Sequence, residues 1–409
     1  MKNCRPEEIL ITGVGITSAI GQGKEAFSSA LLQGRHNFGV MQRPGRQKET
    51  AFLGAEIPAL CYPESFSKKV LRTASFTGQV ALATLQEAWQ EAELDEVEQC
   101  RIGLVIGGSN LQQREMLQIY ANYGEKAQFI RPTYGMTFMD SDLCGLCTEQ
   151  FGIKGFAYTA GGASASGQFA IIQAIQAVLS GQVDVCIALG ALMDISYLEC
   201  QALRSLGAMG TDRYAGQPEL ACRPFDKNHD GFIFGECCGA IVIEGRASAT
   251  NRHIRPYAAI NGWAVGMDAN RNPNPSYEGE VGVITKALEM ARIQSCEIDY
   301  INPHGTGSII GDEIELKALR DCGLSHAYIN ATKSITGHGL TAAGAVEIIA
   351  TLLQMKESQL HPTRNLEEPI DPSFNWVGGE GVKHSFKNAL SLSLGFGGIN
   401  TALCLTNLL

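Results

Sequence analysis

The sequence has few charged residues and no cluster of lysine or arginine. Charged side chains make up 18% of its 409 residues, and the formal net charge is −10. Proteins that bind nucleic acid broadly need grouped basic side chains that displace counterions from phosphates. The composition therefore excludes a general nucleic-acid-binding protein. It also means that an acidic partner would need a local basic area on the surface.

The sequence also lacks a long apolar run. At its start, "MKNCRPEEILITGVGI", acidic residues and then Gly and Thr occur where a secretory signal needs an unbroken apolar core. No later run reaches the length that crosses a bilayer. We therefore expect a cytoplasmic protein without membrane association. Because 45% of the residues are hydrophobic, the chain can bury a substantial core.

Paired cysteine motifs are nearly absent although the chain has thirteen cysteines. Their number is odd and their positions are scattered, which is untypical of a secreted disulfide framework. Cys144 and Cys147 form one CxxC, but no second pair and no histidine stands at ligand spacing. We expect reduced, mostly buried thiols and no metal.

Buried strands alternate with amphipathic helices along the chain, which predicts an α/β fold. The stretch 8–21 reads as a strand that turns at Gly13 and Gly15 toward a helix over 24–34, and Ser18 replaces the third glycine of a dinucleotide fingerprint. A single long helix is predicted over 70–92. We place two halves at 1–250 and 251–409, because 252–279 is the least structured stretch. Further strands are predicted over 101–108, 183–191, 235–245, 390–398 and 400–408, and further helices over 167–179, 279–293 and 342–355.

Two loops carry candidate catalytic residues. The stretch "INPHGTGSIIGDEIELKAL" places His304 after an apolar run and before a helix with Asp312 and Glu315. The stretch "ATKSITGHGLTAAGAVEIIA" places Lys333 and His338 in a similar loop. Loops at strand ends are where α/β enzymes position reacting groups. Each histidine alone is as typical of a cap or a core as of a catalyst, but two such loops together favour catalysis.

Five motifs in order resemble the β-ketoacyl-carrier-protein synthases, the condensing enzymes with the thiolase fold. They are "ITGVGITSAIGQG", "CRPFDKNHDGFIFGECCGAIVIE", "INPHGTGSIIGDEIE", "TKSITGHGLTAAGAVE" and "LSLGFGGIN". The resemblance implies a five-layer αβαβα sandwich, a homodimer and no bound cofactor, with the substrate carried on the phosphopantetheine arm of an acyl carrier protein. The residues that it implies are His304, His338, Lys333 and Phe396 in catalysis, Thr306 and Ser308 on the phosphopantetheine, and Glu347 and Asp312 in support.

The cysteine nucleophile of this family is missing. In the turn "TAGGASASG" the position seventeen residues before Gly181 is Ser164, and an alternative register puts Gly161 there. The length of the following helix favours Ser164. Either register leaves no thiol, because no cysteine lies between Cys147 and Cys186.

A serine in this place changes the expected chemistry. A thiol at a helix start can ionise near neutral pH, whereas a hydroxyl needs a general base and a group that orients the base. We therefore expect acyl loading to be lost or very slow. Decarboxylation of a malonyl thioester needs only oriented donors for the enolate oxygen, each contributing about 2.7 to 4 kcal/mol, and His304 and His338 would serve as these donors.

The combination of two retained histidines with Ser164 is similar to the ketosynthase-like malonyl-carrier-protein decarboxylases of polyketide β-branching. Those enzymes supply acetyl-carrier protein to an HMG-CoA-synthase-like partner. Two alternatives stay open. One is a serine-dependent acyltransferase, although "GASASG" only approximates a nucleophile elbow. The other is a non-catalytic partner like the chain-length factors, which usually lose histidines as well.

Docking of an acidic carrier protein needs basic side chains. Lys68, Lys69 and Arg72 are the candidates, since Lys68 and Arg72 share a helix face. A solvated charged face is the alternative interpretation. We expect Asp226, Asp230 and Glu236 to be structural.

Overall fold

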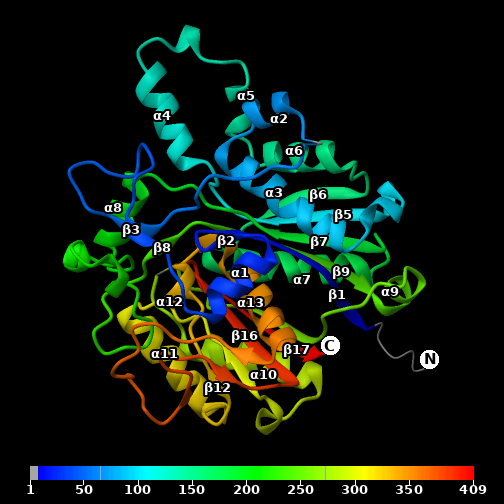
Figure 1. The fold of residues 1–409 in the computed structure, drawn as a ribbon, viewed down its shortest axis with the longest axis vertical. Helices are drawn as coiled ribbons and strands as arrows, with labels where there is room; N and C mark the ends of the chain where they lie inside the picture. Colours follow the sequence, from blue (N-terminus) through cyan, green and yellow to red (C-terminus); the bar gives the residue numbers. More distant parts are fainter. Residues whose placement is uncertain (1–7, 65, 272) are drawn as a thin grey trace.

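The computed structural model describes residues 8–64, 66–271 and 273–409, and a large mixed β-sheet runs through its centre (Figure 1). Within the described residues the sheet has 12 strands, and its order is β14-β12-β11-β16-β17-β10-β1-β9-β7-β5-β6, with β2 beside β1. The strands are β1 Ile9–Ser18, β2 Gly21–Gln22, β5 Ile102–Gly107, β6 Phe156–Ala160, β7 Val185–Gly190, β9 Cys237–Gly245, β10 Ala258–Met267, β11 Tyr300–Asn302, β12 Tyr328–Ile329, β14 Asn375–Trp376, β16 Asn388–Gly395 and β17 Ile399–Asn407.

Three short strands, β3 Phe38–Val40, β4 Leu53–Ala55 and β8 Phe234–Gly235, form a second sheet, and β13 Gln359–Leu360 pairs with β15 Val382–Lys383.

Helices cover both faces of the large sheet and also lie between its two parts. The helices are α1 Lys24–Leu32, α2 Lys68–Thr73, α3 Phe76–Glu91, α4 Gln113–Tyr123, α5 Tyr134–Thr137, α6 Ser141–Phe151, α7 Ser166–Leu179, α8 Tyr197–Ser205, α9 Arg246–Asn251, α10 Tyr277–Ala291, α11 Ile309–Asp321, α12 Lys333–Thr336 and α13 Ala343–Glu357.

The sheet folds around α7 and α13, which gives five layers (Figure 1). One outer layer is α3, which packs with β5, β7 and β9. The other outer layer holds α10 and α11, which pack against β16 and β17. Between the two parts of the sheet, α7 and α13 share one core with residues of β1, β9 and β17. This architecture confirms the predicted thiolase-like α/β fold.

Alternation of side chains explains why the strands are apolar throughout. In β9, Ile241 and Ile243 face the central helices, whereas Ala240 and Val242 face the outer core under α3. Successive strand residues point to opposite faces, so a strand with helices on both sides must be apolar at every position. Hydrophobic alternation cannot reveal which face is which.

Three local predictions are wrong. The chain does not turn at Gly13 and Gly15, because β1 continues to Ser18. A Cβ on Gly15 would lie 2.1 Å from the carbonyl oxygen of Thr84, so this glycine lets α3 lie close against the strand. The single helix predicted over 70–92 is two helices, since Ser75 caps α3 by accepting a hydrogen bond from Gly78 N. The stretch 252–279 contains the ten-residue strand β10.

The topology brings four loops together. They follow β6, β11, α12 and β16, and they hold Ser164, His304, His338 and Phe396 respectively. In the described part of the chain, every helix is too short or too polar to cross a membrane.

Candidate active site

The turn that holds Ser164 is strained and tightly bonded. Ala163 has a φ of +46°, a conformation that residues with a side chain rarely adopt outside functional sites. The Ser166 hydroxyl accepts a hydrogen bond from Gly162 N at 2.9 Å and donates to the Ala163 carbonyl at 2.7 Å. The Ser393 hydroxyl donates to the Ser164 carbonyl at 3.1 Å. These bonds fix Ser164 at the N-terminal end of α7.

His338 faces Ser164. The Ser164 Oγ lies 2.8 Å from His338 Nε2. The backbone of His338 is held on both sides, since its N–H donates to Ile233 O at 2.7 Å and its carbonyl accepts from Gly235 N at 3.1 Å. The ring of Phe232 meets the imidazole edge-on at 5.0 Å between centroids. The imidazole therefore has little freedom to rotate.

His304 completes a pair of imidazoles. Its ring centroid lies 5.5 Å from that of His338, and the two ring planes are nearly perpendicular at 85°. Glu315 on α11 holds the loop, because its carboxylate accepts from His304 N at 2.6 Å and from Gly305 N at 2.8 Å. The predicted catalytic loops thus meet at one point.

Lys333 and Glu347 form a buried pair behind the histidines. The Lys333 ammonium donates to Glu347 Oε1 and to the carbonyl oxygen of His304. Burial raises the pKa of Glu347 to about 7, against the opposing charge of Lys333. Lys333 touches the His304 backbone rather than the cavity, so it acts on His304 through position and charge.

The electrostatic surroundings keep both imidazoles neutral. Burial holds the pKa of His304 well below its ordinary value, and the charge of Lys333 and the nearby ring of His338 also lower it. Burial and then Lys333 lower the pKa of His338 in the same way. In the part of the chain that the structure describes, Nδ1 of each ring is buried and has no hydrogen-bond partner. A buried N–H without a partner is rarer than a buried acceptor without one, so the proton belongs on Nε2.

Thr306 and Ser308 shape the loop that follows His304. Ser308 caps α11, since its hydroxyl accepts from Gly311 N at 3.1 Å, and the Thr306 hydroxyl accepts from Ser308 N at 3.2 Å. Asp312 accepts from Thr306 N at 3.2 Å, from Gly307 N at 3.1 Å and from Phe225 N at 2.6 Å. Of the two hydroxyls, that of Ser308 caps the helix, and both residues also line the cavity.

A cavity of about 600 Å³ connects these groups. Ser164, His304, His338 and Phe396 all line it, and the side chain of Phe396 is 42% exposed. One part of its wall is apolar and includes Met193, Leu203, Phe232 and Leu340. Among the described residues no cysteine lines the cavity, and no group of three or more His, Cys, Asp or Glu side chains could hold a metal ion.

The predicted docking residues lie elsewhere. Lys68, Lys69 and Arg72 are all exposed on α2, and none of them lines the cavity. The serine that caps this short helix is Ser67, whose hydroxyl accepts from Lys69 N.

Three contributors were missed from the sequence. The sequence shows Glu315 in the helix after His304 but does not reveal that its carboxylate holds the His304 loop. Ser393 and Phe232 fix the Ser164 turn and the His338 ring. Ser393 sits at an inward position of an apolar strand, which was an available signal. Phe232 gave no sequence signal, because an aromatic after a glycine is usual in any core.

The similarity to known proteins extends over the whole chain. The model of the β-ketoacyl synthase N-terminal domain matches residues 6–249, and that of the C-terminal domain matches residues 257–367. The chain is 66% identical over 408 residues to the polyketide biosynthesis malonyl-ACP decarboxylase PksF of Bacillus subtilis (strain 168), covering 100% of this chain and 98% of that protein.

More distant relatives are condensing enzymes. The chain is 30% identical to 3-oxoacyl-[acyl-carrier-protein] synthase 2 of Staphylococcus aureus (strain COL), with 97% of each chain covered. The crystal structure of a β-ketoacyl synthase from Burkholderia phymatum STM815 superimposes with a TM-score of 0.89 at 26% identity, covering 98% of this chain and all of that one.

Proposed function

The chain belongs to the β-ketoacyl synthase family, and we propose that it decarboxylates malonyl-ACP to acetyl-ACP without forming an acyl-enzyme. The observation that carries this proposal is a pair of neutral imidazoles in a cavity where a serine stands in place of a thiol. The 66% identity to a malonyl-ACP decarboxylase over the full chain supports the same substrate and reaction.

The negative charge that develops in the reaction lies on the enolate oxygen, which is the atom that the two imidazoles would contact. As the bond between the α-carbon and the carboxylate breaks, CO2 leaves and its bonding electrons form an enolate of the thioester. The Nε2–H groups of His304 and His338 donate to the enolate oxygen. Donors that are already oriented in a site with little water stabilise such a charge by about 2.7 to 4 kcal/mol each. A proton from water or a relay then reaches the α-carbon and gives acetyl-ACP.

Ser164 is poorly equipped to become acylated. A serine nucleophile needs a basic partner and a third group that orients the partner. His338 lies within hydrogen-bond distance, but its lowered pKa makes it a weak base. Its Nδ1 has no acceptor among the described residues, so the orienting group is missing. Ser164 instead accepts the His338 Nε2–H until the substrate oxygen takes its place. These features disfavour the acyltransferase alternative.

A silent partner is also disfavoured. Such a protein has no reason to keep two histidines, a lysine and a glutamate in bonded positions around a cavity of about 600 Å³. The contacts of Glu315 with the His304 loop would likewise be unnecessary.

The substrate arrives on a carrier protein. We propose that Thr306 and Ser308 receive its phosphopantetheine arm at the cavity, with Phe396 beside them, and that the carrier docks on α2. The reaction itself needs no bound cofactor. The acetyl-ACP product would pass to an HMG-CoA-synthase-like partner in polyketide β-branching, in line with the polyketide role in the name of the 66% identical relative.

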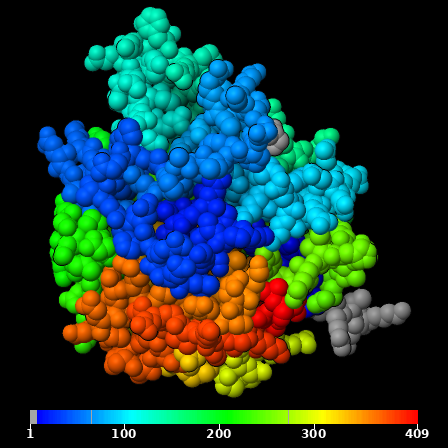
Figure 2. Space-filling view, viewed as in Figure 1, coloured from blue at the N-terminus to red at the C-terminus, as the bar shows by residue number. Residues whose placement is uncertain are grey.

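We also propose a homodimer. The large sheet ends at β6, which pairs with β5 on one side and has no strand on the other within the described residues. Near this edge, α4 and α5 project from the molecule (Figures 1 and 2). The segment around these helices exposes several large apolar side chains, which are Tyr120, Phe129, Met136, Phe138 and Met139. An apolar surface of this kind is typical of an interface.

The proposed function is tested by removing one donor at a time. We expect His304→Ala and His338→Ala each to lower kcat for malonyl-ACP by about 10²- to 10³-fold, because each removes a donor made for the enolate oxygen. The release of CO2 is the measurement. His326→Ala is the matched control, since His326 bonds to the Ile298 carbonyl outside the cavity. Wild-type turnover in both active-site variants would refute the assignment.

A further inference from the structure

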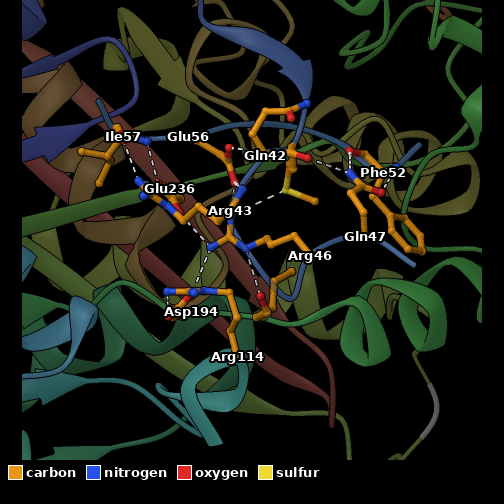
Figure 3. A network of polar contacts seen from close by, with 12 residues as sticks. Gln42, Arg43, Arg46, Gln47, Phe52, Glu56, Ile57, Arg114, Asp194 and Glu236 are labelled. Atoms are coloured by element: carbon orange, nitrogen blue, oxygen red, sulfur yellow. Dashed lines mark hydrogen bonds and ion pairs between the residues drawn. The ribbon is translucent and has the colours of Figure 1, made fainter. Parts of the chain in front are cut away.

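A buried arginine lies beneath the active site. Arg46, in the loop between β3 and β4, has no exposed surface. Its guanidinium donates to Asp194 at 2.9 Å, to Glu236 at 2.7 Å, to Glu56 at 3.3 Å and to the Ile195 carbonyl at 3.0 Å (Figure 3). It also lies 4.9 Å from the ring centroid of Phe234. A guanidinium can bridge several acceptors at once because its donors form a rigid fork.

Two further arginines complete the cluster. Arg43 forms two bonds to Glu236, at 2.5 and 2.7 Å, and Arg114 forms two bonds to Asp194, at 2.8 and 2.9 Å (Figure 3). Each of these carboxylates therefore has an arginine of its own besides Arg46. What Arg46 adds is the connection between the two pairs.

The two carboxylates lie on two different segments of the chain, and each segment contributes a residue to the cavity lining, Met193 in one and Phe232 in the other. Asp194 follows Met193, which lines the cavity, and it bonds through its backbone to Leu111 and Arg114, just after the lining residue Asn110. Glu236 follows Gly235. Arg46 therefore joins the segments 109–114 and 191–195 to the segment 232–236.

The backbone of His338 is hydrogen-bonded to the segment 232–236. Phe234 forms a parallel bridge with His338, and the backbone bonds of Ile233 and Gly235 to His338 lie on either side of it. Gly235 packs tightly against the same loop, since a Cβ there would lie 2.0 Å from Thr336 O. The opposite side of the segment is held by Glu236, whose carboxylate accepts from Ile57 N at 2.6 Å and from Arg46. A shift at Glu236 would thus move His338.

From this connection we propose that Arg46 is a positioning residue for decarboxylation, which fixes the placement of His338 against Ser164 by locking the segment 232–236 to the segments 109–114 and 191–195. Replacing a buried ion cluster with apolar side chains often leaves stability unchanged or improves it, so stability alone gives no reason for this cluster. A role in fixing the position of the His338 donor would explain the cluster, because small displacements of a catalytic group reduce rates strongly.

The test replaces Arg46 by a side chain of similar length without charge. We expect Arg46→Met to fold, because Arg43 and Arg114 still neutralise both carboxylates, and to lower kcat for malonyl-ACP about 10- to 100-fold at unchanged KM. Arg46→Lys is the second variant. It keeps the charge but lacks the separate nitrogens that donate to the Ile195 carbonyl and to Glu56, so we expect a smaller loss of kcat of the same kind.

The matched control is Arg252→Met. Arg252 forms a comparable partly buried pair with Glu244 and bonds to the Ala92 carbonyl, away from the cavity. We expect it to lower Tm without changing kcat. If Arg46→Met and Arg46→Lys both turn over like the wild type, or if Arg252→Met loses kcat equally, the positioning role is wrong.

A second readout separates this inference from the proposed function, on which its kinetic test rests. In protein labelled with ¹⁵N-histidine, the Nε2 signal of His338, identified by its absence in His338→Gln, should shift or broaden in Arg46→Met and stay unchanged in Arg252→Met. An unchanged signal in Arg46→Met would overturn the positioning role whatever the enzyme's reaction. Absence of decarboxylation in the wild type, with the signal shifted in Arg46→Met, would reject only the proposed function.

Discussion

At the scale of single residues, the site depends on two imidazoles that stay neutral. A neutral imidazole with its proton on Nε2 presents a donor to the enolate oxygen, whereas Nδ1 faces the protein interior. Burial and the charge of Lys333 both oppose protonation. In the proposed mechanism, the surroundings that keep His304 and His338 as donors also make His338 a weak base, so we expect Ser164 to be held in place without being activated.

The buried state of His338 has a consequence for stability. Its pKa is lowered in the folded protein, so below about pH 6.5 the unfolded chain binds a proton that the folded chain does not. The lowered pKa of His338 therefore makes the folded protein less stable as the pH falls below about 6.5. We expect the Tm of His338→Gln, relative to the wild type, to be higher at pH 5 than at pH 8.

The control for this pH effect is His253→Gln. The side chain of His253 is exposed, so it is solvated in both states and its replacement should shift Tm equally at both pH values. A Tm difference for His338→Gln that is the same at pH 5 and pH 8 would contradict the burial of a neutral imidazole.

Much of the site could be predicted from the sequence, because five family motifs occur in the family's order along the chain and contain several of the site residues. His304 and His338, which two of the motifs contain, and Ser164, which was placed by its spacing to Gly181, all line one cavity. The roles of Glu315 and Phe232 were not predictable, since they depend on which backbone or ring lies opposite them in space. The same holds for Arg46, whose bonds reach Asp194 and Glu236, which stand far away in the sequence.

Among the helices, a short break determines which residues begin a helix and which side chains are exposed on it. Ser75 separates α2 from α3, so Lys68, Lys69 and Arg72 sit on a six-residue exposed helix instead of the start of a long one. The apolar spacing over 70–92 does not reveal this break, because serine is tolerated in helices and its capping bond depends on local geometry. Conversely, Gly13 and Gly15 indicate a turn by composition, yet they serve close packing of α3 on β1.

The separate position of α2 makes carrier docking testable. We expect Lys68→Glu combined with Arg72→Glu to raise KM for malonyl-ACP several-fold and to leave turnover of malonyl-pantetheine unchanged, because an acidic carrier would be repelled. The steady-state kinetics of both substrates are the measurement. Lys383→Glu with Lys387→Glu reverses two exposed charges elsewhere and is the matched control. Equal effects on both substrates, or equal effects of both double variants, would reject docking on α2.

At the scale of the whole molecule, the fold follows from strands that are apolar on both faces. Such strands need helices on either side, and the two central helices α7 and α13 supply the inner cover for both parts of the sheet. Sequence alone indicated the α/β class, and the family resemblance indicated the five layers. Within the described residues, β6 is one of the two end strands of the large sheet, and the segment around α4 and α5 exposes several large apolar side chains.

This exposed surface leads to a prediction of assembly. We expect the wild type to be a dimer and Phe129→Glu with Phe138→Glu to shift it toward the monomer, because charges replace apolar contacts at the interface. Light scattering coupled to size-exclusion chromatography gives the mass. Met290→Glu, which places a charge at an exposed apolar position on α10, should leave the dimer intact. A wild type that is monomeric, or a double variant that stays dimeric, would contradict the proposed interface.

In the proposed reaction, carbon–carbon cleavage proceeds by stabilising an enolate, without a covalent acyl-enzyme. Intact-mass spectrometry of the wild type incubated with malonyl-ACP tests it most directly, with Ser164→Cys offered acetyl-ACP as the control that should gain an acyl group. We expect the carrier to lose the mass of CO2 while the mass of the enzyme stays constant. A malonyl carrier that keeps its carboxylate, together with an enzyme that gains acyl mass at Ser164, would contradict it.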